Sequence, residues 1–388
     1  RRFRRPRRRV LVAFLLFGAG AGTCLAMLAA MAIVFVQLSW SHTDALGNPQ
    51  FGINYSCRQA EYLLLEDPAK GPAGYVDRSR PNRAQWCADT LGAILDGTGA
   101  KHVRISVVWS EVEPQPGVYN FSVIDAELAR AQQSGAKVLL GIGIKAQRSP
   151  EFYIPDWVSA KVTLVPGEVI SSNPYLASQA LAMVAAVTAH VAASPAIEAW
   201  AADNEPYVPS ARTEDWTLSR PFVRAEEAAI KSNDPAHRIV SINHAQHFVF
   251  DRHWEDALAD SDALGVSIYP FRNYEILGHN FVVPILEIGP LAPNYAAQAR
   301  AAHAAGKPFW ITEMQAEPWT DTDLRLISPQ HPSPNLTPQK FQQSIDYARR
   351  TGADRVYLWG AEWWLYERDH FGDSRWWDMA RAVLQPSS

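Results

Sequence analysis

The sequence predicts an α/β protein built as a (β/α)8 barrel and preceded by a transmembrane helix. Three observations carry this prediction: an arginine-rich start, a long charge-free apolar run after it, and eight short Val- and Ile-rich runs alternating with amphipathic segments. This alternation is typical of repeated βα units that form a parallel sheet. Eight units in roughly 335 residues fit one (β/α)8 domain with some enlarged loops.

The eight apolar runs are the expected strands of the barrel. They are Phe51–Tyr55, His102–Trp109, Lys137–Gly143, Ile197–Ala202, Arg238–Asn243, Ala263–Tyr269, Pro308–Thr312 and Arg355–Trp359. The expected helices between them include Arg83–Leu95, Val123–Ser134, Pro174–Ala192, Pro221–Ser232, Ala296–Ala305 and Gln339–Arg350. The stretch Pro329–Pro338 is rich in Pro and Ser, so we expect a long loop between the seventh strand and its helix.

A doubly wound sheet is the alternative architecture, but it usually carries a glycine-rich phosphate loop after its first strand. Here the first run leads into Asn54–Cys57, which contains no glycine. Gly141–Ala146 fits the dinucleotide pattern G-x-G-x-x-A, yet Pro150 and Pro155 interrupt the helix that should follow. The barrel remains the expected fold, and no organic cofactor is expected.

The first forty residues have a composition of their own. Seven of the first nine are Arg, and residues 10–41 contain no Asp, Glu, Lys, Arg or His. This run exceeds both the roughly 20 apolar residues of a bilayer span and the roughly 7–15 of a signal-peptide core. Because positive flanks stay in the cytoplasm, we expect a basic cytoplasmic tail (1–9), a transmembrane signal anchor (10–40) and an extracytoplasmic domain (41–388). Cleavage near Ser41–Ala45 is the alternative.

The charge balance argues against one class of partner. Without the seven N-terminal Arg, 29 basic residues stand against 40 acidic ones, a net charge of about −11. Nucleic-acid binding needs clustered positive charge, so no nucleic acid is expected as a partner. The Ala- and Arg-rich composition looks bacterial, and the expected location is the bacterial cell membrane, with a single span and the folded domain outside the cytoplasm.

Three cysteines are present. Cys24 lies in the apolar run, whereas Cys57 and Cys87 lie in the expected exported part, where an oxidising compartment allows a disulfide. We expect a Cys57–Cys87 bridge, with two unrelated buried thiols as the alternative. No metal is expected, because the sequence has no CxxC pair and the histidines at 244, 247 and 253 are too loosely spaced for a site.

Two glutamates follow apolar runs at the carboxyl ends of expected strands, where a barrel carries its chemistry. Asn204 and Glu205 follow the fourth run, and Glu313 ends the seventh, 108 residues after Glu205. Glycoside hydrolysis needs such a pair: one acid protonates the leaving oxygen and the other carboxylate attacks the anomeric carbon. The negative charge of Glu313 is expected to raise the pKa of Glu205, so that the two acids take different roles.

With these residues the sequence resembles glycoside hydrolase clan A, the group that includes families 5 and 39. The resemblance covers Phe51 to about Leu384. It rests on Asn204-Glu205-Pro206, on Ile311-Thr312-Glu313, and on Val103-Arg104-Ile105 leading to Trp109, with Glu113–Phe121 behind it. It implies a retaining β-glycosidase in which Glu205 is the acid/base and Glu313 is the nucleophile.

The resemblance also implies roles for the residues around the two acids. Asn204 would bond the sugar 2-hydroxyl, and Arg104 and Tyr269 would hold Glu313 ionised and oriented. Trp359 would be the sugar platform, and His244 resembles a histidine that some members place beside the acid/base. Arg104 could instead pair with a structural acid, and the two aromatic side chains could belong to the core.

Tryptophan is abundant, with 14 residues, half of them from Trp310 onward. Flat apolar rings suit the faces of sugars, although burial accounts for most tryptophans. We expect Trp109 and either Trp363 or Trp364 to face the site. Glu362 is expected either to bind sugar hydroxyls or to lie in a solvated loop.

The expected function is hydrolysis of a β-linked glycan without metal or organic cofactor. The expected location makes an exopolysaccharide or a cell-envelope polysaccharide the substrate of choice. A transglycosylase that uses the same residues and a non-catalytic glycan-binding barrel are the alternatives, because a fold alone does not fix a function.

Overall fold

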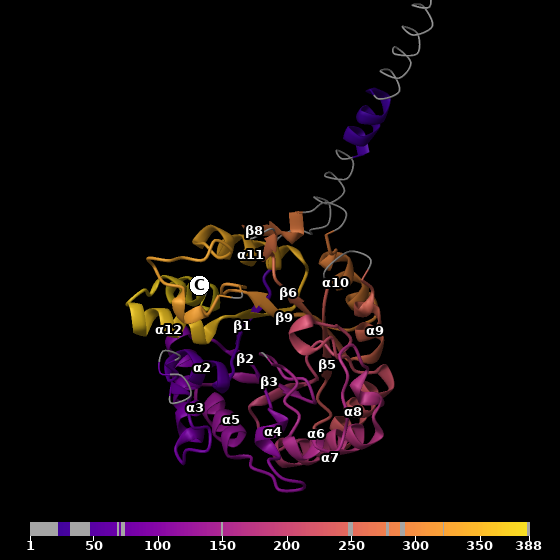
Figure 1. Ribbon diagram of the computed structural model, residues 1–388, viewed down its shortest axis with the longest axis vertical. Helices are drawn as coiled ribbons and strands as arrows, with labels where there is room; N and C mark the ends of the chain where they lie inside the picture. Colours follow the sequence, from indigo (N-terminus) through magenta and orange to yellow (C-terminus); the bar gives the residue numbers. More distant parts are fainter. Residues whose placement is uncertain are drawn as a thin grey trace, which may run out of the picture.

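The computed structural model of the chain contains a closed barrel of eight parallel strands surrounded by helices (Figure 1). The structure describes residues 22–31, 47–67, 70, 74–148, 150–246, 251–276, 279–287, 292–320 and 322–385. Around the barrel the strands lie in the order β1, β10, β9, β6, β5, β4, β3, β2. The (β/α)8 barrel predicted from the sequence is therefore confirmed.

Each barrel strand coincides with one of the eight apolar runs to within a few residues. The strands are β1 (Gln50–Asn54), β2 (His102–Ser106), β3 (Lys137–Ile142), β4 (Ile197–Ala202), β5 (Val240–Ala245), β6 (Ala263–Ile268), β9 (Phe309–Gln315) and β10 (Arg355–Trp359). Parallel strands covered on both faces are apolar almost throughout, which is why the sequence marks them clearly. An antiparallel hairpin after β6, β7 (Phe271–Ile276) with β8 (His279–Pro284), is absent from the sequence prediction.

The helices form an outer layer. They are α2 (Cys57–Leu64), α3 (Arg83–Thr98), α4 (Trp109–Val112), α5 (Ser122–Gln133), α6 (Asp156–Ser159), α7 (Pro174–Val191), α8 (Arg220–Asn233), α9 (His253–Asp260), α10 (Tyr295–Ala304), α11 (Pro338–Arg350), α12 (Ala361–Phe371) and α13 (Arg375–Leu384). Several begin with a capping side chain and an early proline, as in α11, where Thr337 accepts a hydrogen bond from Lys340 N. The long loop expected before α11 is present and contains the short 3-10 turn Leu324–Leu326.

The interior of the barrel has an apolar layer and a polar layer. The apolar layer consists of Leu139, Ala199, Ala201, Ala263, Trp310 and Tyr357. Nearer the carboxyl ends of the strands, Asn54, Arg104, Asn243 and Glu313 are all buried and hydrogen-bonded to one another or to neighbouring strands. We call the face formed by the carboxyl ends of the strands the barrel mouth. The polar layer therefore lies beneath the mouth, where the two predicted acids are.

The expected N-terminal anchor is described only in part. Residues 22–31 form a helix with exposed apolar side chains, such as Leu25 at 68% and Met27 at 62% exposure, and the remainder of 1–40 lies outside the described residues. Among the described helices, one is long and apolar enough to cross a membrane, Pro174–Val191. That helix is α7, which buries Leu176, Val184 and other residues against the barrel.

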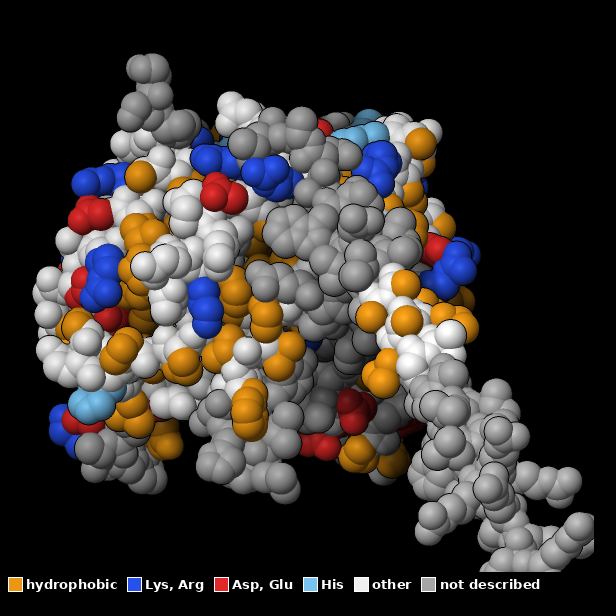
Figure 2. Space-filling view, turned by 90° about the horizontal axis from the view of Figure 1, so that it is seen from above, with side chains coloured by type: hydrophobic (Ala, Val, Ile, Leu, Met, Phe, Trp, Pro, Cys, Tyr) orange, Lys and Arg blue, Asp and Glu red, His pale blue; other side chains and the backbone are white. Residues whose placement is uncertain are grey.

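The surface of the barrel is mixed in character. On the face seen in Figure 2, Lys and Arg side chains lie interspersed with Asp and Glu, and apolar side chains lie between them, several next to one another. Apolar atoms contribute much of the surface of any folded protein.

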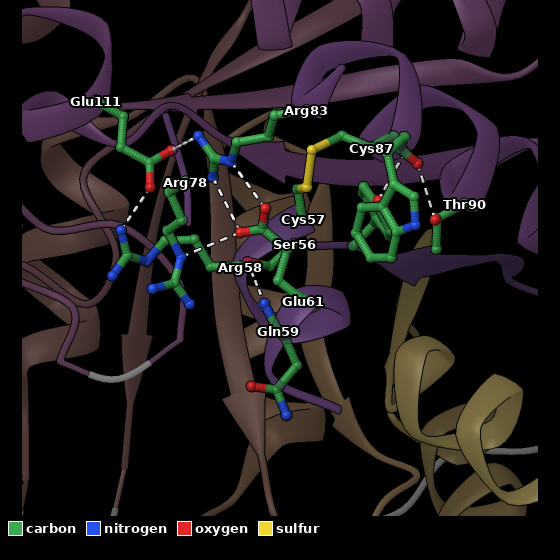
Figure 3. Close-up of a disulfide and its surroundings, with 12 residues drawn as sticks. Ser56, Cys57, Arg58, Gln59, Glu61, Arg78, Arg83, Cys87, Thr90 and Glu111 are labelled. Carbon is green, nitrogen blue, oxygen red and sulfur yellow. Dashed lines mark hydrogen bonds and ion pairs between the residues drawn. A yellow bond between two sulfur atoms is a disulfide. The ribbon is translucent and has the colours of Figure 1, made fainter. Parts of the chain in front are cut away.

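The predicted disulfide is confirmed. Cys57, the first residue of α2, is bonded to Cys87 of α3, with 5.3 Å between their Cα atoms. Figure 3 shows the bond beside an ionic cluster in which Arg83 contacts both Glu61 and Glu111. The bond therefore fixes α2, which follows β1 directly, to the outer helix layer.

Replacing both cysteines, Cys57→Ala with Cys87→Ala, should lower the free energy of unfolding by about 3–4 kcal/mol. The two positions are 30 residues apart, and closing a loop of that length removes about this much chain entropy from the unfolded state. Urea unfolding of the oxidised protein measures the effect. Cys24→Ser is the matched control and should leave the unfolding free energy unchanged; a loss below 1 kcal/mol in the double variant would contradict the prediction.

Candidate active site

The turn after β4 carries Asp203, Asn204 and Glu205 in a backbone conformation that is unusual outside glycine. Asp203 and Glu205 have φ angles of 56° and 47°, a region that costs energy for most residues. Lys145, in the segment after β3, holds the turn with three hydrogen bonds. Its carbonyl accepts from Asn204 N (2.7 Å), its N–H donates to Asp203 Oδ1 (2.6 Å), and its Nζ donates to Glu205 O (3.1 Å).

Asp203 supports this turn from beneath. A Cβ at Gly143 would lie 2.2 Å from Asp203 Oδ1, so only glycine fits at that position. Glu226 of α8 lies beside Asp203, and burial followed by the charge of Asp203 raises the pKa of Glu226 far above its usual range. Burial also raises the pKa of Asp203, so both carboxyl groups favour the neutral form more than an exposed acid does.

Arg104 of β2 links the two predicted acid-bearing segments. One guanidinium nitrogen, Nη1, donates to Glu313 Oε1 at 2.8 Å, and Nη2 donates to Asn204 Oδ1 at 2.7 Å. Tyr269, which follows β6, donates its hydroxyl to the other oxygen of Glu313 at 2.7 Å. Both oxygens of Glu313 are thus fixed, and its carboxylate is oriented by residues from two other strands.

Asn243 of β5 belongs to the same group, although the sequence analysis did not identify it. Its Oδ1 accepts a hydrogen bond from Glu205 N (3.0 Å), and its Nδ2 donates to Asn204 Oδ1 (3.1 Å). Because Arg104 also donates to Asn204 Oδ1, the oxygen of that amide is engaged twice. The amide of Asn204 is held in one orientation and retains its Nδ2 as a donor.

The two acids differ in their surroundings. Burial raises the pKa of Glu205, while the charge of Lys145 lowers it and that of Glu151 raises it. Burial and the charge of Glu205 raise the pKa of Glu313, while Arg104 and Tyr269 lower it. Burial, rather than the charge of Glu313 that the sequence analysis emphasised, is the main cause at Glu205.

Two buried carboxyl groups that repel each other retain one proton to a higher pH than an isolated acid does. Glu313 accepts hydrogen bonds from a guanidinium and a phenol, both of which stabilise its charged form. These contacts favour the charged form of Glu313, whereas burial favours the neutral form of Glu205. The arrangement supplies one acid and one oriented carboxylate at the same barrel mouth.

Trp359, at the end of β10, lies next to this pair. Its ring centroid is 6.3 Å from that of Tyr269, and the guanidinium of Arg148 lies 4.0 Å from its centroid. Arg148 is in turn paired with Glu317 and with Glu362, the latter at 2.8 Å. Glu362 is therefore a buried ion-pair partner of Arg148 rather than an exposed loop residue.

His244 does not lie beside Glu205. It is inside β5, fully buried, with Nε2 3.1 Å from Gln298 Oε1 of α10. Because neighbouring residues of a strand point to opposite faces, Asn243 faces the barrel interior and His244 faces the helices. Burial lowers the pKa of His244 to about 4, which keeps the ring neutral.

Two of the expected sugar-facing tryptophans lie in the core. Trp109 is 1% exposed and donates Nε1 to Glu113 Oε2 at 2.8 Å. Trp363 is also 1% exposed and packs 5.4 Å from Trp376, and its neighbour Trp364 donates to Ala316 O at 2.7 Å. These contacts account for both rings as core residues, and neither ring is exposed.

One group of possible metal ligands occurs among the described residues, and it consists of Cys57, Cys87 and Glu127. Its two sulfur atoms are bonded to each other, so they are not available as thiolate ligands of a metal ion. It also lies on α2, α3 and α5, away from the two predicted acids.

A family model described as beta-galactosidase, of glycoside hydrolase family 42, matches residues 82–217. This range contains Arg104, Asn204 and Glu205. A sequence search of curated proteins finds no match.

Solved structures of glycoside hydrolases are similar to this chain in fold. The beta-galactosidase of the psychrophilic Marinomonas ef1 superposes with a TM-score of 0.53 at 15% identity, covering 80% of this chain and 53% of that one. GH5_18 from Streptomyces cattleya, in complex with GlcNAc, gives a TM-score of 0.53 at 15% identity, covering 81% and 71%. GH5_18 from Bifidobacterium longum, in complex with Manb1-4GlcNAc, gives 0.52 at 15%, covering 80% and 68%. The chain spans about half the length of the beta-galactosidase.

Replacing Lys145 should change the acidity of Glu205 in a defined direction. Lys145→Met removes a positive charge next to Glu205 and should raise its pKa further, whereas Glu151→Gln removes a negative charge and should lower it. Carboxyl ¹³C NMR titration of glutamate-labelled protein measures both. A pKa that moves in the same direction in the two variants, or in neither, would refute this electrostatic assignment.

Proposed function

We propose that this chain, a glycoside hydrolase of clan A, is a retaining enzyme that cleaves a β-linked glycan, with Glu205 as acid/base and Glu313 as nucleophile. One observation carries the proposal: both oxygens of Glu313 are held by Arg104 and Tyr269, while Glu205, which follows β4 at the same mouth, has a pKa raised by burial. These are the properties that a nucleophile and a proton donor need.

In the first step, Glu205 protonates the glycosidic oxygen while the Glu313 carboxylate attacks the anomeric carbon. The leaving alcohol departs, and a glycosyl ester forms on Glu313. Loss of the negative charge on Glu313 lowers the pKa of Glu205. Glu205 can then take a proton from a water that attacks the anomeric carbon, which breaks the bond to Glu313 and releases its carboxylate. The Asn204 Nδ2 group, oriented by Arg104 and Asn243, is the donor available for the sugar 2-hydroxyl.

The comparisons support a β-linked substrate. The similar structure of a GH5_18 variant from Bifidobacterium longum holds Manb1-4GlcNAc. We infer that this chain takes a neutral β-linked oligo- or polysaccharide, and that its natural source is an exopolysaccharide or the cell envelope. The inferred natural source depends on the membrane anchor proposed below.

Two variants test the catalytic roles. Glu205→Ala should reduce kcat by about 10²–10⁴-fold on glycosides with poor leaving groups, and azide should restore turnover of an activated aryl glycoside as a β-glycosyl azide. Glu313→Gln should abolish turnover of both, because no ester can form. Nitrophenol release measures turnover of the activated aryl glycoside, and reducing-sugar release measures turnover of glycosides with poor leaving groups.

Glu214→Gln is the matched control, since Glu214 is an exposed residue of the loop that carries Glu205, and it should retain wild-type kcat. Unchanged turnover in Glu313→Gln would reject the nucleophile assignment. Absence of turnover on every aryl β-glycoside by the wild-type chain would reject the enzymatic proposal.

We also infer that residues 10–40 anchor the chain in the membrane with the barrel outside the cytoplasm. The support is the charge-free run after the N-terminal arginines and the exposed apolar side chains of residues 22–31. Water contact of such a surface is unfavourable, and a bilayer would remove it.

Cys24, within the apolar run, makes the anchor testable, because Cys57 and Cys87 are bonded to each other. In isolated membranes a maleimide should label Cys24 only after detergent is added, and the chain should remain with the membranes after an alkaline wash. A soluble chain, or labelling by an impermeant maleimide without detergent, would contradict the anchor.

A further inference from the structure

The segment after β3 crosses the barrel mouth. Near its start, Lys145 contacts the turn after β4. Two residues later, Gln147 Nε2 donates to Tyr55 O (2.6 Å), just after β1, and to Arg104 O (3.3 Å), in β2. Arg148 then reaches Glu317, which follows β9, and Glu362, which follows β10. The segment therefore runs over the ends of β2, β1 and β10.

The strand order shows how far this crossing extends. Three strands separate β3 from β9 in either direction around the barrel, so these two strands lie on opposite sides. The segment after β3 and the Arg148–Glu317 pair together therefore join opposite sides of the mouth, along the side of β2, β1 and β10.

We call Arg148, Glu317 and Glu362 the cross-mouth bridge. The guanidinium of Arg148 binds both oxygens of Glu317, and it stacks on the ring of Trp359. Glu362 accepts a hydrogen bond from Arg148 Nη2 with one carboxylate oxygen (2.8 Å) and one from Ser56 N with the other (2.6 Å). The exposures of Arg148, Glu317 and Glu362 are 7%, 5% and 0%, so one buried guanidinium lies between two buried carboxyl groups.

We propose that the cross-mouth bridge closes one end of the substrate site, so that the enzyme removes the terminal sugar from the non-reducing end of a chain and does not cut within it. This inference rests on the proposed roles of Glu205 and Glu313. It adds what those roles leave open, namely where along a glycan the enzyme cleaves.

The orientation of the glycan in the site follows from the position of Glu205, the proposed acid. Glu205 must reach the leaving-group oxygen, so the leaving part of the glycan lies on the side of β4, on which Glu205 is half-buried and accessible. In the strand order β10 lies opposite β4. The sugar attacked by Glu313 therefore points its far end toward Trp359, where the guanidinium of Arg148 covers the ring.

A second sugar on that side would have to occupy the space of the bridge. Guanidinium and carboxylate groups at the end of the site match the free hydroxyls of a terminal sugar, to which they can donate and from which they can accept. The substrate class is thus a glycan whose terminal β-linked residue is unsubstituted. A branch or a cap on that residue would meet Arg148 and Glu317.

Nitrophenyl glycosides test the closed end on the purified full-length chain. A panel of nitrophenyl β-monoglycosides identifies the sugar that is hydrolysed, and the 1,3-, 1,4- and 1,6-linked β-disaccharides of that sugar, also as nitrophenyl glycosides, follow. If the end of the site is closed, the enzyme does not split a nitrophenyl disaccharide into nitrophenol and intact disaccharide. That cleavage would require the outer sugar to occupy the space of the bridge. Release of intact disaccharide and nitrophenol in the first turnovers would overturn the proposal.

This design separates two failures. If neither the monoglycosides nor the disaccharide glycosides release nitrophenol, the proposed function fails. If monoglycosides are hydrolysed and intact disaccharide is also released, the function stands and the closed end fails.

The bridge itself is tested by Arg148→Met combined with Glu317→Met, which removes one charge of each sign. The double variant should hydrolyse the monoglycoside more slowly than the wild-type chain. The ratio of the rate of intact-disaccharide release to the rate of monoglycoside hydrolysis should rise by at least about tenfold, or about 1.4 kcal/mol. Glu317→Gln, which keeps a hydrogen bond to Arg148, is the milder second variant and should shift the ratio in the same direction.

Arg325→Met is the matched control. Arg325 is likewise paired with an acid, Asp323, and stacked on an aromatic ring, that of Tyr62 at 4.0 Å, but it does not touch the cross-mouth bridge. It should lose stability without changing the product ratio. If the bridge variants are folded by circular dichroism and also keep the wild-type ratio, the bridge is merely structural and the proposal is wrong.

Discussion

The guanidinium of Arg104 is the contact on which the rest of this site depends. It is 1% exposed, it comes from β2, and it binds Glu313 of β9 with one nitrogen and Asn204 after β4 with the other. A charge so deeply buried must be paired, because an uncompensated one costs several kcal/mol. The acid that Arg104 compensates is the proposed nucleophile, so folding the barrel and orienting that carboxylate are one process.

The same rule organises the loops above the strands. Arg148 is buried only because Glu317 and Glu362 come from the far side of the barrel to meet it. Lys145 is buried against Glu151 and against the carbonyl of Glu205. Each basic residue thus joins two loops that are distant in sequence. These contacts tie the loops of the mouth to one another, which suits a site that must hold two carboxyl groups in fixed positions.

Much of this architecture was predictable from the sequence, for a physical reason. Strands covered on both faces are apolar throughout, so their ends are visible, and Glu205 and Glu313 stand at two such ends. Arg104 and Tyr269 were identified through the resemblance to clan A, and the structure places both on Glu313. The apolar pattern of the strands, together with the rule that barrel chemistry lies at their carboxyl ends, was sufficient to identify Glu205 and Glu313.

The residues that were misplaced or missed depend on tertiary packing. The expected fifth strand ended at Asn243, but β5 runs to Ala245, so His244 lies inside the strand and faces the helices. Trp109 and Trp363 could not be distinguished from site residues, because core and sugar-binding tryptophans look alike in a sequence. Arg148 and Lys145 lie in an irregular segment whose path is set by contacts with other strands, and no periodic pattern marks it.

The central claim is that Glu205 and Glu313 act by double displacement. The most direct test is the anomeric configuration of the first product, read by ¹H NMR within the first minutes of hydrolysis of an aryl β-glycoside, before mutarotation. The account predicts the β-anomer as the initial product, followed by slow appearance of the α-anomer. An initial α-anomer would mean inversion and would contradict a glycosyl ester on Glu313.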